Sequence, residues 1–274
     1  MSVLDHKLSV PGETSGSAGN RPRWEKRRMH HVFAADGRAV VVAMDHCISW
    51  GAVAGLIDAK NAVMKVIAGG ADAVMTTIGM GRTVRDEIGG AGSIVVLDSE
   101  RSVVSYGIDA ALRFGADAAE LKVFPGSAVD DKLGELRELA AMADAHGLPL
   151  LAEAIPVSFT DVQAHTVKNI ADAARICAEA GADFIKVPFA GTAQEYRAVV
   201  GAAFVPVIVL GGAPRANPVD ALRLAADAMD AGARGVVFGR NVFQADDPAR
   251  MVAALCRVVH AGESVESAAS LLAA

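Results

Sequence analysis

A single lysine interrupts a short apolar segment in the second half of the chain. In the stretch GADFIKVPFA, residues 181–190, Lys186 is surrounded by phenylalanine, isoleucine, valine and proline. Burial in such surroundings disfavours the ammonium form, so we expect a lowered pKa for Lys186. A lysine brought toward neutrality can attack a carbonyl carbon and form a Schiff base. Two simpler interpretations stay open: a lysine paired with a carboxylate, and a lysine whose head reaches solvent at the end of a strand.

Other charged residues interrupt apolar segments in the same way. Asp45 and His46 close the segment VVVAMDHC, Glu120 and Lys122 lie in AAELKVFPGS, and Glu153 lies in LLAEAIP. Because side chains alternate along a strand, Glu120 and Lys122 share one face of theirs. In a closed sheet, such charges can meet oppositely charged side chains only if they point into the barrel near the carboxyl ends of the strands.

Three of these residues suit proton transfer and carbonyl chemistry if their strands are neighbours. Like-charge repulsion from Lys122 would depress the pKa of Lys186, and Glu153 could shuttle protons while a carbinolamine loses water. Asp45 is a second candidate for proton transfer, an anchor for substrate hydroxyls, or a cap of the following helix. We interpret His46 as structural. A Lys–Glu–Lys network that only serves packing is the open alternative.

Eight short apolar runs could position these residues. They are rich in Val, Ile, Leu or Ala and lack the alternation of half-exposed strands. They span Ala39–Met44, Ala73–Thr77, Ser93–Leu97, Ala119–Phe124, Leu148–Ala154, Phe184–Val187, Val205–Leu210 and Gly235–Phe238. Stretches between them, such as Thr166–Ala180 and Pro218–Ala231, have a helical period. Eight strand–helix units over about 250 residues predict an α/β fold, a (β/α)8 TIM barrel, with a doubly wound open sheet as the competitor.

A short motif recurs at every second unit. It is found at Gly70-Ala71-Asp72, Gly115-Ala116-Asp117, Gly181-Ala182-Asp183 and Gly232-Ala233-Arg234. Glycine there would stop a helix in the left-handed conformation before the next strand. Duplicated quarter barrels would leave this recurrence, and convergent loop chemistry is the alternative.

Composition limits the domain count and the partners. The chain has 274 residues, of which 52% are hydrophobic, and a net charge of −6. We interpret residues 1–27, rich in Gly, Ser and Pro, as a flexible N-terminal arm, and residues 28–274 as a single barrel domain. The acidic balance predicts no nucleic-acid partner, and without an apolar run of about 18 residues we expect no membrane span. Three cysteines without paired or zinc-type spacing favour a reducing cytoplasm and no metal.

The ends of the seventh and eighth strands indicate an anion site. Gly211 and Gly212 follow the seventh strand in VIVLGGAP, and Gly239 and Arg240 follow the eighth in GVVFGRN. Barrels commonly bind phosphate at this place through glycine N–H groups and a short helix N-terminus. Arg240 would add a bidentate charge. The sequence therefore predicts a phosphate-binding site here.

Taken together, several segments resemble a known family. AMDH, GADAVMTT, PLLAEA, GADFIKV, LGGAP and GARGVVFGRN-x-F-Q are similar to the class I aldolases that group archaeal-type fructose-bisphosphate aldolases, heptulosonate synthases, and deoxyribose-phosphate and tagatose-bisphosphate aldolases. The resemblance covers about residues 28 to 260. It implies a Schiff base on Lys186, an active-site role for Asp45, and phosphate held by Gly211, Gly212, Gly239 and Arg240. It also implies dihydroxyacetone phosphate or a similar phosphorylated ketone as donor, an aldehyde as acceptor, no cofactor, and a homo-oligomer.

The chain departs from part of this family on its fifth strand. Archaeal-type fructose-bisphosphate aldolases and heptulosonate synthases carry Tyr-Pro-Arg-Gly there, with the tyrosine as general acid. This chain has AEAIPVSF, and Ile155 stands where the tyrosine is expected. Glu153 and Lys122 instead resemble the glutamate and the strand-four lysine of the tagatose-bisphosphate aldolases. We therefore expect a carboxylate, Glu153 or Asp45, as the proton carrier.

The stretch MHHVFAADGRAVVVAMDH suggests the acceptor. It resembles a secondary-metabolite branch of the family that joins aspartate 4-semialdehyde to dihydroxyacetone phosphate on the way to 3-amino-4-hydroxybenzoate. The expected product is a phosphorylated amino-ketoheptanoate. A fructose- or tagatose-bisphosphate-type aldolase is the alternative. Two other classes stay open: a phosphate-binding barrel isomerase that uses Asp45 and Glu153, and a non-catalytic sensor.

Overall fold

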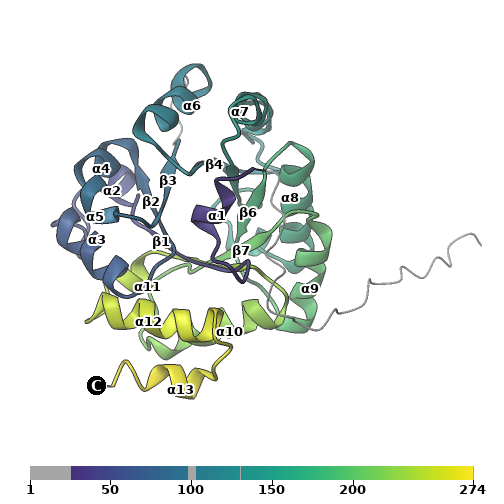
Figure 1. Ribbon diagram of the computed structural model, residues 1–274. Helices are drawn as coiled ribbons and strands as arrows, with labels where there is room; N and C mark the ends of the chain where they lie inside the picture. The colour runs from purple at the N-terminus through teal and green to yellow at the C-terminus, as the bar shows by residue number, and fades with distance from the viewer. Residues whose placement is uncertain (1–25, 98–102, 130, 274) are drawn as a thin grey trace, which may run out of the picture.

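The computed structural model describes residues 26–97, 103–129 and 131–273, and a closed barrel of parallel strands forms its centre (Figure 1). The strands are β1 (Ala39–Ala43), β2 (Ala73–Thr77), β3 (Gly92–Val96), β4 (Ala118–Val123), β5 (Leu150–Ala154), β6 (Phe184–Val187), β7 (Val207–Leu210) and β8 (Gly235–Phe238). They pair in chain order, and β8 pairs with β1. The predicted (β/α)8 barrel is confirmed, and the open sheet is wrong because this last pairing closes it.

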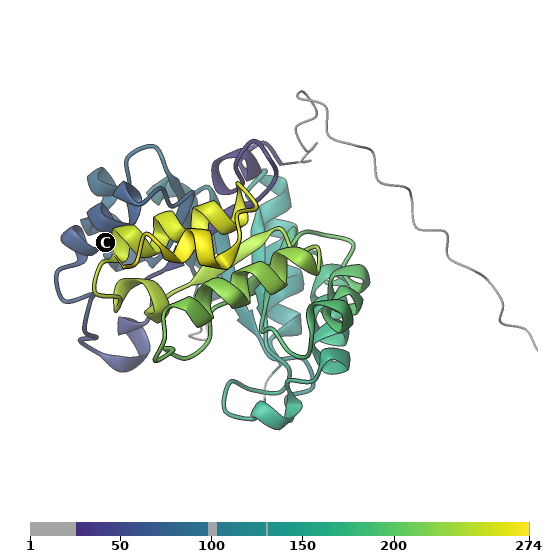
Figure 2. The ribbon, with the colours of Figure 1, turned by 90° about the horizontal axis from the view of Figure 1, so that it is seen from below.

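Helices surround the barrel and follow the strands along the chain, apart from the first helix, which precedes β1 and lies in the centre of the ring (Figures 1 and 2). They are α1 (Met29–Val32), α2 (Cys47–Trp50), α3 (Ala59–Ala68), α4 (Ile78–Thr83), α5 (Arg85–Ile88), α6 (Val103–Phe114), α7 (Leu133–Ala145), α8 (Val167–Glu179), α9 (Ala193–Ala202), α10 (Val219–Asp230), α11 (Arg240–Phe243), α12 (Pro248–Val259) and α13 (Val265–Ala269), with a 3-10 turn at Val162–Ala164. Across the described ranges, no helix has the length and apolarity needed to span a membrane.

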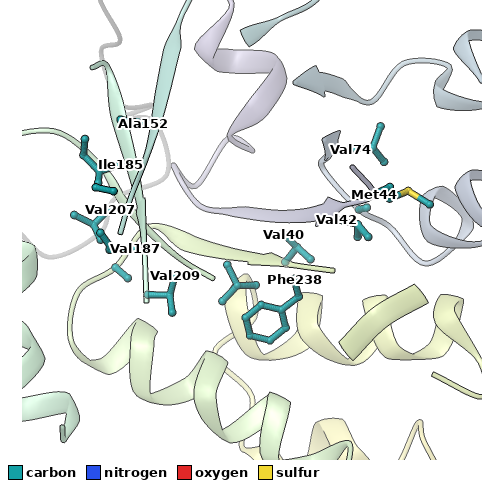
Figure 3. Close-up of a cluster of buried hydrophobic side chains, with 14 of the residues drawn as sticks. Val40, Val42, Met44, Val74, Ala152, Ile185, Val187, Val207, Val209 and Phe238 are labelled. Atoms are coloured by element: carbon teal, nitrogen blue, oxygen red, sulfur yellow. The ribbon is translucent and has the colours of Figure 1, made fainter. Parts of the chain in front are cut away.

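The strands are buried on both faces, which explains their continuous apolar sequences. Outward side chains such as Val209 and Phe238 point toward the surrounding helices and belong to the larger hydrophobic cluster (Figure 3). A second cluster fills the barrel interior with inward side chains such as Val41, Ile94 and Phe184. The period of two along each strand therefore separates the helix-facing core from the barrel interior.

Helix α1 closes one end of the barrel. In Figure 1 it lies in the centre of the ring, and Met29, Val32 and Phe33 belong to the interior cluster. The Phe33 ring meets the Phe184 ring edge-on, with 5.6 Å between centroids. Water is excluded from this end, which we call the floor, so the interior is reached from the carboxyl ends of the strands.

The repeated Gly-Ala-Asp motif has a structural role at the floor. Its glycines adopt positive φ values, 95° at Gly70, 88° at Gly115 and 103° at Gly181, as expected for helix stops. Each aspartate also accepts a bond from the backbone N–H of a residue in an odd-numbered strand: Asp72 from Val40, Asp117 from Ser93 and Asp183 from Leu150. The carboxylates thus tie successive units of the barrel together.

Basic side chains bind to the same aspartates. His31 lies 2.6 Å from Asp117, and Lys26 donates to Asp183 at 2.8 Å, so both ends of the α1 segment are anchored to the floor. Residues 1–25 of the predicted N-terminal arm lie outside the described residues. Within the predicted range of the arm, Lys26 is already held by the barrel.

His260 makes the third such contact and generates a pH prediction. Its two ring nitrogens lie 3.0 Å from Asp72 and 2.9 Å from Asp36. The bond to Asp72, helped by Asp36 and opposed by burial, raises the pKa of His260. A raised folded-state pKa means that the stabilisation is fully present below the ordinary value near 6.5 and is lost as pH rises through the folded value.

We expect His260→Asn to lower the free energy of unfolding by about 1 kcal/mol at about pH 6 and by much less at about pH 9. Urea denaturation at both pH values measures this difference. His30→Asn, at an exposed position of α1, is the control and should change neither value. An equal loss at both pH values would contradict the role given to the charged imidazole.

Candidate active site

Three inward side chains lie side by side near the carboxyl ends of β4, β5 and β6. The strand register pairs Lys122 with Glu153 and Glu153 with Lys186. Asp45 follows β1 and reaches the same region across the barrel. The structure therefore brings together all four residues for which catalytic roles were predicted. The alternation of side chains along each strand was sufficient to place the three strand residues on inward faces.

The four side chains form two ion pairs. The Lys186 Nζ atom lies 2.9 Å from Glu153 Oε2, and the Lys122 Nζ atom lies 3.1 Å from Asp45 Oδ2. The Lys186 and Glu153 residues are only 5% and 3% exposed. Asp45 binds Lys122 through its carboxylate, and the N-cap residue of α2, His46, makes no side-chain capping bond. Buried charges are thus matched in pairs, as their desolvation requires.

The expected lowering of the Lys186 pKa is wrong. Burial does lower the pKa, and Lys122 adds a smaller repulsion, but the carboxylates of Glu153, Glu120 and Asp45 outweigh both and raise it. The sequence showed the apolar neighbours along the strand but not how many carboxylates the adjacent strands would bring. Lys186 therefore rests as an ammonium group with a proton acceptor, Glu153, in contact.

Asp45 and His46 are shifted by the same surroundings. Burial acts to raise the pKa of Asp45, but Lys122 and Lys186 lower it overall, so the carboxylate is ionised. Burial lowers the pKa of His46 despite the nearby Asp45. The His46 ring packs between the rings of Trp50 and Phe243, with centroid distances of 5.4 and 5.1 Å. A neutral, packed imidazole agrees with the structural interpretation of His46.

The loops after β7 and β8 meet beside this cluster of ion pairs. Arg240 donates to the carbonyl oxygen of Gly212 at 3.3 Å, and its guanidinium lies 4.8 Å from the centre of the Trp50 ring. Burial lowers the pKa of Arg240, but a guanidinium remains charged at any physiological pH. The loop residues predicted to hold phosphate are therefore neighbours, and a cation is held among them.

Gly239 is required by close packing as well. A Cβ atom at this position would lie 2.3 Å from His46 Cε1 and 2.9 Å from the carbonyl oxygen of Ala43. Gly211 is similarly crowded by the Phe238 ring, whereas a Cβ atom at Gly212 would meet open space at a φ of 71°. Two of the three glycines thus let a loop approach its neighbours, and Gly212 serves the backbone conformation.

Asn241 organises this region and was not singled out from the sequence. Its side-chain nitrogen donates to the carbonyl oxygens of Gly211 and Ala213, at 3.1 and 3.2 Å, and its oxygen accepts from the Arg215 N–H at 2.9 Å. The side chain is buried and fully used. An asparagine directly after the arginine of GRN-x-F-Q, where the chain leaves a buried strand, was the available signal.

Glu120 is the other residue to which sequence reasoning gave no role. It lies two residues before Lys122 on the inward face of β4 and is 0% exposed. Neither of its carboxyl oxygens has a hydrogen-bond partner within the described part of the chain. Buried polar groups are nearly always hydrogen-bonded, so a buried carboxyl group without a partner requires an explanation.

A groove of about 390 Å³ lies elsewhere on the molecule. It is lined by α3 residues such as Asn61 and Lys65 and by the segment from Phe243 to Pro248. None of the predicted site residues line it. We place the site at the ion pairs inside the barrel because the buried titratable groups are there. Among the described side chains, no group of three or more His, Cys, Asp or Glu residues is arranged to hold a metal ion.

A barrel with a buried lysine in contact with a carboxylate below the mouth has the arrangement of an enzyme that attaches carbonyl compounds to lysine. Comparisons with known proteins agree. Residues 39–245 match the DeoC/LacD family of aldolases. A 2-amino-3,7-dideoxy-D-threo-hept-6-ulosonate synthase of Halobacterium salinarum is 38% identical over 245 residues, which cover 86% of this chain and 92% of that protein.

Solved structures point to the same family. A Schiff-base-forming fructose-1,6-bisphosphate aldolase, studied through its reaction intermediates, has a TM-score of 0.75 and 27% identity, and the match covers 86% of this chain and 99% of that one. An archaeal fructose-1,6-bisphosphate aldolase with its catalytic lysine bound to the carbinolamine intermediate has a TM-score of 0.74 and 26% identity, over 85% of this chain and 98% of that one. The chain belongs to the DeoC/LacD aldolase family and is a class I aldolase, a lyase.

Proposed function

We propose that this chain joins dihydroxyacetone phosphate to aspartate 4-semialdehyde through a Schiff base on Lys186. The observation that carries the proposal is the 2.9 Å contact between Lys186 Nζ and Glu153 Oε2 inside the barrel. The contact is an ion pair whose angles do not make a hydrogen bond, and the Lys186 ammonium donates its hydrogen bond to Met75 Sδ. The distance is nevertheless short enough for proton transfer from the amine to the carboxylate, which amine attack on a ketone needs.

The steps balance with these groups alone. Lys186 passes a proton to Glu153, its nitrogen attacks the ketone carbon, and the ketone oxygen leaves as water after taking two protons. The iminium then carries the same single positive charge as the ammonium. Loss of a proton from the adjacent carbon gives an enamine, which attacks the aldehyde carbon, and the new alkoxide takes that proton back. Water finally releases the product and restores Lys186.

The donor phosphate would lie between the loops after β7 and β8. Arg240 supplies the charge, and the backbone N–H groups near Gly211, Gly212 and Gly239 supply further donors. The Trp50 ring against the guanidinium and the bond to Gly212 support this role, because both hold Arg240 in place before an anion arrives.

The acceptor is supported by the name of the Halobacterium relative. That name describes a seven-carbon 2-amino acid with a ketone at C6. An aldol bond joins the first and second carbons beyond a ketone, here C5 and C4. Cleavage there gives a three-carbon ketone and a four-carbon amino-acid aldehyde, aspartate 4-semialdehyde. With a phosphorylated donor, the product is a phosphorylated amino-ketoheptanoate, which suits a precursor of 3-amino-4-hydroxybenzoate in secondary metabolism.

A fructose-bisphosphate-type activity is the second candidate, because two of the solved structures are fructose-1,6-bisphosphate aldolases. Ile155 sets this chain apart from those aldolases and equally from the heptulosonate synthases, so it does not separate the two candidates. This residue follows β5, is fully buried and has no titratable group where the resemblance requires a tyrosine. Product analysis with dihydroxyacetone phosphate and either aspartate 4-semialdehyde or glyceraldehyde 3-phosphate separates the two candidates.

Borohydride trapping tests the covalent step. Wild-type enzyme treated with dihydroxyacetone phosphate and borohydride should gain the mass of the reduced donor, and peptide mapping should locate it on Lys186. We expect Lys186→Ala to abolish both trapping and turnover. Since that change leaves Glu153 without its cation, Lys186→Arg is the matched variant that keeps the charge and lacks the nucleophile. Trapping that persists in both variants would move the Schiff base to Lys122, and an unlabelled wild type would favour an isomerase.

Arg240→Ala should raise the KM for dihydroxyacetone phosphate by about tenfold or more, because a charge-assisted contact contributes about 1.5 to 3 kcal/mol. Dihydroxyacetone, which lacks the phosphate, is the control substrate and should be affected much less. The measurement is the KM of each donor in both enzymes. Equal effects on the two donors would place the phosphate elsewhere.

Glu153→Gln should lower turnover by about 100-fold or more, because it keeps the volume and hydrogen-bonding capacity of the side chain but cannot transfer a proton. Trapping on Lys186 should survive in part, since water can act slowly in the dehydration step. Single-turnover kinetics and trapping are measured together. Asp45→Asn is the comparison variant: if it stops turnover while Glu153→Gln remains nearly active, Asp45 is the proton carrier.

A further inference from the structure

Glu120 lies under the ion pairs and takes part in neither. On β4 it is two residues from Lys122, and the register places it beside Val96 of β3 and Leu151 of β5. Both neighbours are apolar and buried. The carboxyl group is therefore enclosed by the barrel wall, with no water-exposed side and no hydrogen-bond partner in the described ranges.

Four charged groups act on this carboxyl group, one from each of four strands or strand ends. They are Asp45 after β1, Lys122 of β4, Glu153 of β5 and Lys186 of β6. Each ammonium is already in contact with another carboxylate, Lys122 with Asp45 and Lys186 with Glu153. Glu120 is thus the fifth titratable group in a set whose other four members are neutral as two pairs.

We propose that Glu120 is a positioning residue for the Schiff-base reaction: a neutral carboxylic acid beneath Lys186 that leaves Glu153 as the one carboxylate in contact with the nucleophile. This inference rests on the proposed function of Lys186. It assigns Glu120 no contact with substrate.

Burial makes the neutral form the stable one. An ionised carboxylate without hydrogen bonds inside the barrel would lose its hydration without compensation. Burial accordingly raises the pKa of Glu120 well above its usual range, with Glu153 and Asp45 adding to the effect and the two lysines opposing it. The charge of Glu120 also affects Lys186, because an ionised Glu120 is one of the three carboxylates that raise the pKa of Lys186. A protonated Glu120 removes that contribution.

The consequence is a lower barrier to proton loss from Lys186. With Glu120 neutral, the ammonium has to give its proton to Glu153 against two carboxylates, Glu153 and Asp45, instead of three. Formation of the iminium conserves the single positive charge on the lysine nitrogen, so the set of five groups stays neutral before and after the covalent step. An ionised Glu120 would leave the set with a net negative charge in a water-excluded interior.

Glu120→Gln tests this inference, because glutamine copies the neutral acid in size and cannot ionise. Two measurements are needed. The first is the 13C resonance of the side-chain carboxyl in glutamate-labelled wild-type enzyme without substrate, assigned by its loss in Glu120→Gln. The second is the rate of borohydride trapping with dihydroxyacetone phosphate across the pH range in both enzymes. Glu138→Gln, on the exposed face of α7, is the matched control for labelling and folding.

We expect the Glu120 resonance to be that of a protonated acid at neutral pH. At neutral pH, the trapping rate of Glu120→Gln should lie within about threefold of the wild-type rate. At a pH where the wild-type Glu120 resonance has titrated to the ionised form, the variant should trap the donor at least about threefold faster than wild type. Three results would overturn the inference: an ionised resonance at neutral pH, a loss of trapping of about tenfold or more in a folded Glu120→Gln enzyme, or pH profiles that stay superimposable through the pH at which the wild-type resonance titrates. Failure of wild type itself to trap would instead show that the proposed function is wrong, and the resonance would still report the state of Glu120.

Discussion

Charge neutralisation inside a water-excluded barrel is the constraint on which the site depends. Two lysines placed on inward faces would be too costly to desolvate alone, and each is matched by a carboxylate at 2.9 or 3.1 Å. The pairing fixes both the position and the protonation of Lys186, the proposed nucleophile. It also means that reactivity comes from a proton acceptor in contact with Lys186, and not from a lysine that is neutral at rest.

Much of the fold could be predicted because local sequence and global topology agree. The eight apolar runs coincide with the strands to within two residues at each end, since parallel strands buried on both faces need continuous apolar sequence. The alternation of side chains then placed Lys122, Glu153 and Lys186 on one surface without any knowledge of contacts. The Gly-Ala-Asp motif was recognised as a helix stop, but its aspartates were not recognised as acceptors for strand N–H groups. That role depends on which strand lies beside each loop.

The parts of the site that could not be predicted depend on distances between strands. The expected direction of the Lys186 pKa shift was wrong because the direction is decided by carboxylates such as Glu153 of β5 and Asp45 after β1, which lie far from residue 186 along the chain. Asn241 was missed for a similar reason, since its three partners belong to the loop after β7. The glycines of the predicted phosphate loops were noticed for their N–H groups, yet Gly239 is also needed for the approach of His46.

The closed floor has a kinetic consequence. With α1 filling one end of the barrel, molecules reach the depth of Lys186 through a single opening at the strand carboxyl ends. In the proposed reaction, a ketone attached to Lys186 would lie below an aldehyde that approaches its enamine, so the ketone would have to enter before the aldehyde. In the reverse direction of that reaction, the aldehyde would have to depart before the ketone is released from the lysine. The architecture therefore favours an ordered sequence of binding and release, with the donor first in and last out.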